Sequence, residues 1–92
     1  MAIEALTLSE TTNIAGVADL HAALSARLEA ADGAALVVDC SAVRTIDAAS
    51  LQCLLMAKKR AEKAGVHFEL RQASEDFDRY VDYVGLRAHL FG

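Results

Sequence analysis

A short apolar run in the middle of the chain constrains the fold more than any other segment. The run from Ala35 to Cys40 reads ALVVDC, and it stays apolar until Asp39. Apolar residues on both faces are typical of a central strand in a parallel sheet, because neighbouring elements cover both of its sides. The run therefore predicts an α/β domain built around this strand.

Two segments with helical periodicity flank this strand, and a third lies near the C-terminus. We expect helices over residues 17–31 and 48–63, and a third helix that begins after the N-cap residue Ser74 and stops at Gly85. The apolar positions that repeat at helical spacing are Val17, Leu20, Leu24, Leu28, Leu51, Leu54, Leu55, Phe77, Tyr80, Val81 and Val84. These helices are amphipathic, so each has one face to bury against a sheet.

Two further segments are expected to be strands, residues 3–8 near a sheet edge and residues 66–70. Gly33 and Gly65 stand where the C-terminal caps of the first two helices belong. Strands joined through helices require crossover connections, which are right-handed and favour parallel pairing. We therefore expect residues 1–92 to form a single domain: one small, mixed or partly parallel α/β sheet with helices packed on one face.

The overall composition argues against several classes of protein. A hydrophobic content of 54% is too high for a disordered chain, and a net charge of −4 argues against a nucleic-acid partner. No apolar stretch approaches about 20 residues, and no charged-then-apolar leader opens the chain. Cys40 and Cys53 lie inside apolar runs, as packing cysteines in a reducing compartment do. We expect a soluble, cytoplasmic protein without direct membrane insertion.

The sequence offers no arrangement that is typical of metal binding or catalysis. His21, His67 and His89 are more than 20 residues apart and lack cysteines at zinc-finger spacing. Ser50 has no identifiable histidine to serve as its base. We expect no catalytic residue, no metal and no cofactor, and hence no enzyme.

The most informative segment connects the central strand to the second helix. Asp47 stands where an N-cap belongs, with its carboxylate placed to accept from the amide of Ala49 or Ser50. Ala48, Ala49 and Ser50 add little side-chain bulk to the first turn. A partner can therefore approach the positive end of this helix closely.

Here the sequence resembles the STAS family, the domain shared by sulfate transporters and anti-sigma factor antagonists. The matching residues are Leu36-Val37-Val38-Asp39, Ala42-Val43, Ile46-Asp47, Leu51, Leu54-Leu55, Ala64-Gly65 and Gly85-Leu86. The resemblance covers nearly the whole chain and implies a non-catalytic regulatory domain. It implies a partner that is an anti-sigma factor or a related histidine-kinase-type ATPase, acting in signalling to transcription. An accessory subunit of an ABC-type lipid-trafficking transporter, or of a chemotaxis kinase complex, is the alternative that the resemblance leaves open.

The resemblance also implies where the partner binds. The implied contact residues are Arg44, Thr45, Asp47, Ala48, Ala49, Ser50 and Gln52. In the family's antagonists the aspartate is followed by two hydroxyl residues, of which the second is phosphorylated, and by a glycine. In this chain Ala49 occupies the acceptor position and Ser50 replaces the glycine. We therefore expect the phosphoswitch to be absent or degenerate, with Ser50 as the remaining candidate phosphoacceptor.

Overall fold

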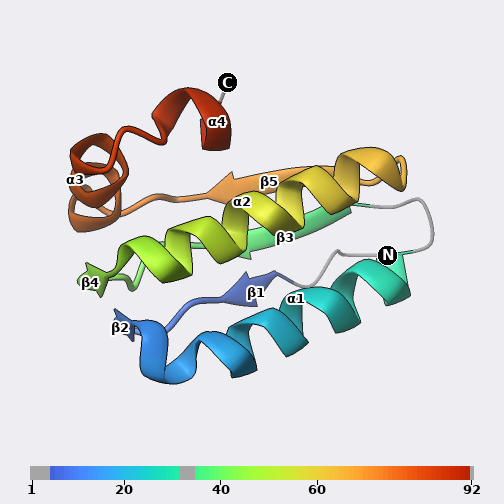
Figure 1. Cartoon of the computed structure of the whole chain (residues 1–92), viewed down its shortest axis with the longest axis horizontal. Coiled ribbons are helices and arrows are strands. Elements are labelled where there is room, and N and C mark those ends of the chain that lie inside the picture. The colour runs from blue at the N-terminus through green and yellow to red at the C-terminus, as the bar shows by residue number, and fades with distance from the viewer. Residues whose placement is uncertain (1–4, 32–34, 92) are drawn as a thin grey trace.

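A three-stranded parallel sheet forms the centre of the computed structural model, which describes residues 5–31 and 35–91. Its strands are β1 (Leu6–Thr7), β3 (Ala35–Asp39) and β5 (His67–Arg71), in the order β1-β3-β5 (Figure 1). Val38 lies opposite Leu6 on one side and Leu70 on the other. The apolar run thus occupies the central strand, as its sequence predicts.

Helices α1 (Val17–Ala31) and α2 (Ala48–Lys63) lie side by side on one face of this sheet (Figure 1). The sheet grows in one direction, since β3 lies next to β1 and β5 lies next to β3 on the far side. Two right-handed crossovers that follow the same direction bring both connecting helices to the same face. Gly65 has a φ of 73°, which confirms the expected glycine cap after α2. Gly33 lies outside the described residues.

A second, two-stranded parallel sheet corrects the prediction of a single sheet. It pairs β2 (Thr11–Thr12) with β4 (Thr45–Ile46), and a 3₁₀ turn, η1 (Ile14–Gly16), then leads into α1. Strands of two residues have too few positions to show a period of two, so the sequence pattern cannot reveal them. The strand expected over residues 3–8 is shorter in the structure, where β1 covers Leu6 and Thr7. Ile3 and Glu4 of the expected strand lie outside the described part of the chain.

The hydrophobic core fills the space between the sheet and the two helices. Its fully enclosed members include Leu24 of α1, Val38 of β3, and Leu51 and Leu54 of α2. Burying aliphatic side chains of this size stabilises the fold by about 1.5–3 kcal/mol each. Across the described ranges, no helix combines the length and the apolar character needed to cross a membrane.

The C-terminal third closes one end of the core. Helix α3 (Glu75–Tyr83) begins at the expected N-cap, where Ser74 Oγ accepts from the Phe77 amide at 3.0 Å and donates to the Val43 carbonyl at 2.6 Å. Helix α4 (Arg87–Phe91) then packs against α2, and the Phe91 ring meets the Phe77 ring of α3 edge-on, with 6.3 Å between the ring centroids. Residues 87–91 therefore pack onto the body of the domain.

Arg87 fastens α4 to α3. Its guanidinium donates hydrogen bonds to the carboxylates of Asp82 and Asp78, and it lies 5.3 Å from the centre of the Phe91 ring. The hydrogen bond from Arg87 holds the pKa of Asp82 below its usual value. The ionised form of Asp82 is therefore the one that stabilises the folded chain.

Replacing Asp82 with Asn should lower the melting temperature at neutral pH and lose this effect in acid. The folded-state pKa of Asp82 lies below the unfolded value, so its contribution is present above about pH 4 and disappears as the pH falls through the folded-state pKa. Thermal unfolding of the wild type and of Asp82→Asn across this range checks the expectation. Glu62→Gln on the exposed side of α2 is the matched control. Equal pH profiles of the melting temperature for the two variants would contradict the role assigned to Asp82.

Candidate functional site

Asp47 fixes the start of α2. Its carboxylate accepts a hydrogen bond from the Ser50 amide at 2.9 Å, which confirms the expected N-cap. The Asp47 amide donates to the Thr12 carbonyl of β2 at 3.1 Å. The first turn of the helix is therefore tied to a neighbouring strand as well as capped.

The segment before Asp47 is held to β2 by its backbone and exposes its polar side chains. The amides of Arg44 and Thr45 both donate to the Glu10 carbonyl, at 2.8 and 3.0 Å. Val43 and Ile46 are buried, whereas Arg44 and Thr45 are exposed. The two buried residues anchor the segment, and the two residues between them face solvent.

Six of the seven residues implied by the resemblance lie together at this end of the molecule, where β2, β4 and the first turns of α1 and α2 meet (Figure 1). Ala48 and Gln52 are exposed and one helical turn apart, so they share a face of α2. Asp47 and Ala49 are partly buried. We call the set Arg44, Thr45, Asp47, Ala48, Ala49 and Gln52 the α2-start surface.

Ser50 does not belong to this surface, contrary to the expectation for a contact residue. Its side chain is fully buried, and its hydroxyl has no hydrogen-bond partner among the described residues. Successive helical residues are rotated by about 100°, which turns Ser50 toward the same buried side as Leu51 and Leu54. As a phosphoacceptor Ser50 would have to leave the core before a kinase could reach it.

The structure adds β2 to the residues that sequence patterns identified. Thr11 is exposed and lies opposite Thr45 in the β2–β4 ladder, and the exposed Asn13 accepts from the Ala15 amide at 3.0 Å. A partner that covers Thr45 therefore meets Thr11 as well. The only signal in the sequence was the polar run 9–13, which is equally typical of a loop.

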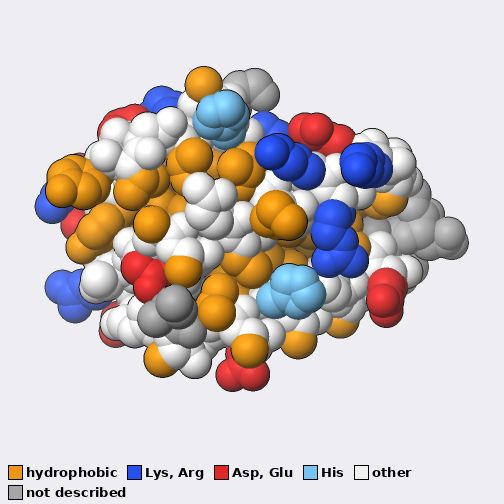
Figure 2. Space-filling model, in the orientation of Figure 1, with side chains coloured by type: hydrophobic (Ala, Val, Ile, Leu, Met, Phe, Trp, Pro, Cys, Tyr) orange, Lys and Arg blue, Asp and Glu red, His pale blue; other side chains and the backbone are white. Residues whose placement is uncertain are grey.

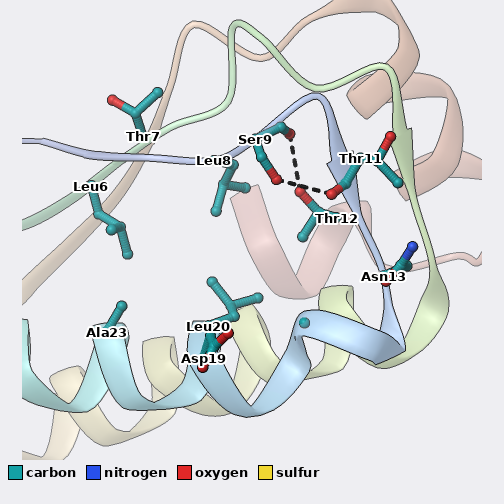
Figure 3. A pocket seen from close by; sticks show the side chains of 11 residues that line it. Leu6, Thr7, Leu8, Ser9, Thr11, Thr12, Asn13, Asp19, Leu20 and Ala23 are labelled. Atoms are coloured by element: carbon teal, nitrogen blue, oxygen red, sulfur yellow. Dashed lines mark hydrogen bonds between the residues drawn. The ribbon is translucent and has the colours of Figure 1, made fainter.

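A hollow of about 300 Å³ lies on the other side of β2, between β1 and the beginning of α1 (Figure 3). Two of its hydroxyls form local hydrogen bonds: Ser9 Oγ donates to the Thr11 carbonyl at 2.9 Å, and Thr12 Oγ1 donates to the Ser9 carbonyl at 3.1 Å. These bonds close the turn between β1 and β2. Two residues that line the hollow therefore help to hold β2 in place.

The two cysteine thiols are held in their protonated form. Burial, with a smaller effect of Asp39, raises the pKa of Cys40 to about 12. Loss of solvent also raises the pKa of Cys53 on α2. Neither shift is that of an activated nucleophile, which needs a lowered pKa. Within residues 5–31 and 35–91, no group of three or more His, Cys, Asp or Glu side chains is placed to share a metal ion.

Comparison with known families places nearly the whole chain in one of them. The family model described as "Mlab, STAS domain" matches residues 3–91. No curated protein matches the chain. The match includes every residue of the α2-start surface and all the strands and helices described above.

Replacing Ser50 with Ala should raise the free energy of unfolding by about 1 kcal/mol, because it removes a buried hydroxyl without a partner. Ser50→Glu should instead destabilise the fold by several kcal/mol, because it places a carboxylate in the core. Urea unfolding of both variants measures these changes. Ala48→Glu, exposed on the same turn, is the control, and its free energy of unfolding should stay near that of the wild type. A Ser50→Glu protein as stable as the wild type would contradict the burial of Ser50.

Proposed function

The chain belongs to the STAS domain family, and from this membership we propose that it is a non-catalytic regulatory protein that acts by binding another protein. Its partner is an anti-sigma factor or a related histidine-kinase-type ATPase. The observation that carries this proposal is the first turn of α2, where Ala48 and Ala49 leave the backbone accessible beside the capped and anchored Asp47.

The α2-start surface is suited to binding because it is already ordered. Hydrogen bonds from Arg44 and Thr45 to Glu10, and from Asp47 to Thr12, hold its backbone before any partner arrives. A segment that is fixed in advance loses less conformational entropy on binding. The positive end of the helix dipole also favours a partner's carboxylate or carbonyl groups at this turn.

An accessory-subunit role is the second candidate, and the absence of an accessible phosphoacceptor in the first turn of α2 favours it. Ala48 and Ala49 carry no hydroxyl, and the Ser50 hydroxyl is buried. A subunit that stays bound to the ATPase of an ABC-type lipid-trafficking transporter, or to a chemotaxis kinase complex, needs no phosphoswitch. The identity of the bound ATPase distinguishes this role from anti-sigma factor antagonism.

Ala49→Arg should weaken partner binding by at least about ten-fold, because a long charged side chain then occupies the centre of the α2-start surface. Ala49 is partly exposed, so the fold should change little in stability. The measurement is affinity capture from the native cell with tagged wild-type and variant chains, followed by quantitative mass spectrometry.

The matched control for this capture is Ala30→Arg, which adds the same side chain at an exposed position in the last turn of α1, far along the helix from the α2-start surface. An ATPase retained by the wild type and by Ala30→Arg, but lost with Ala49→Arg, is the expected result. Equal recovery of that ATPase with all three chains would refute the placement of the site.

Regulation by phosphate should be absent. Intact-mass analysis of the chain purified from its native host is expected to show the unmodified mass, because the usual acceptor position is Ala49 and the Ser50 hydroxyl is enclosed by the core. Peptide mapping covers the other serines and threonines. A stoichiometric phosphate on Ser50 would overturn this expectation and make Ser50 the switch residue.

A further inference from the structure

An apolar groove runs between α1 and α2 on the face that is turned away from the sheet. It encloses about 470 Å³ and is lined on α1 by Val17 and Leu24 and on α2 by Cys53, Met56 and Ala57. Figure 2 shows hydrophobic side chains gathered over these two helices. Met56 is 60% exposed, although a large apolar side chain is usually buried. The groove is an apolar surface without a cover in the described part of the chain.

One end of the groove is joined to the α2-start surface. Ala49 and Gln52 belong to that surface and also line the groove. They lie on the same stripe of α2 as Met56, at intervals of three, four and seven residues. A partner that contacts the first turn of α2 can therefore extend along the groove without a break.

The other end of the groove is cationic. Arg60 lines it and is held there by a hydrogen bond to Ser25 Oγ of α1 at 2.9 Å. Beyond Arg60, the surface between the helices continues past Lys63, with Glu29 as the facing carboxylate. Figure 2 shows the Lys and Arg side chains collected over the C-terminal half of α2. The groove thus changes from apolar to positively charged along its length.

We infer that this groove binds one amphipathic α-helix of the partner protein, with apolar side chains over Met56 and a carboxylate against Arg60. The inference rests on the proposed function, because it assigns a second segment of the same partner. Ala49 and Arg60 are about 17 Å apart along the helix axis, which is the length of about three helical turns. A helix of that length presents its apolar residues at the spacing that such grooves accept.

A second copy of the chain fits the groove less well. Two copies joined through the groove would place one hollow against another and leave both unfilled. The acidic helix α3 cannot enter the groove of a neighbour, because its apolar residues Phe77 and Val81 are buried in its own core. Its outward side offers Tyr83 as the exposed large hydrophobic residue. The charge and shape of the groove therefore favour a helix from a different protein.

Two synthetic peptides of about 15 residues test the inference directly. Both are amphipathic helices with the same leucine stripe, and one carries glutamates where the other carries lysines. Each is titrated into the isotope-labelled full chain while the backbone amide signals are followed by NMR. The glutamate peptide is expected to shift the amides of residues that line the groove and to bind at least about ten-fold more tightly than the lysine peptide.

Variants then assign the preference to the groove. Arg60→Glu should reverse the preference between the two peptides, whereas Lys59→Glu changes the net charge equally from an exposed position outside the groove and should preserve it. Met56→Glu should weaken binding of the glutamate peptide by about ten-fold or more. Melting temperatures close to wild type establish that each variant is folded.

Equal binding of the two peptides, no binding, or shifts confined to another face would overturn the inference. Sedimentation of the free chain gives a further check: a dimer that Met56→Glu dissociates would make a second copy the occupant and would also overturn it. These outcomes are separate from the test of function, since the peptide titration needs no cellular partner. If Ala49→Arg abolishes capture but neither peptide binds, the α2-start surface stands as the binding site and the inference about the groove is wrong.

Discussion

The parallel pairing of β3 along both of its edges is the interaction on which the rest of the structure depends. β3 meets β1 at two positions and β5 at five, so its backbone groups are bonded while Leu36, Val37 and Val38 are buried. An apolar strand can be enclosed only if its polar backbone is paired in this way. Both crossover helices pack against this sheet, and the polypeptide that leaves β3 leads to the α2-start surface.

The β2–β4 pair holds in place the segment that connects the main sheet to α2. Glu10 and Thr12 accept three amide hydrogen bonds from residues 44–47. Without those bonds, the connection from β3 to α2 would be an exposed loop that becomes ordered only when a partner binds. The conformational entropy lost in that ordering would lower the affinity. With them, the first turn of α2 has a fixed position, and Asp47 can act both as a cap and as part of a surface.

The first turn of α2 separates small residues that lie at the surface from a small residue that faces the core. Ala48 and Ala49 lie at the surface, whereas Ser50 is enclosed among side chains such as Leu51 and Leu54. Ser50 therefore places inside the protein a hydroxyl that has no hydrogen-bond partner in the described part of the chain. The same helix continues through Met56 to Arg60, so the groove begins in the first turn of α2 and follows the helix toward its C-terminal half.

The sequence by itself determined the elements whose physics is local. The apolar run predicted β3, and the helical spacing with the caps at Asp47 and Ser74 predicted α2 and α3. The small residues after Asp47 made the first turn of α2 the candidate site. Tertiary structure alone decided the β2–β4 pairing, because strands of two residues carry no period and are stabilised only by a distant partner. It also decided the burial of Ser50 and the exposure of Met56, since both depend on how α2 is rotated against α1 and the sheet. That rotation is fixed by the packing of the whole core, which no short stretch of sequence specifies.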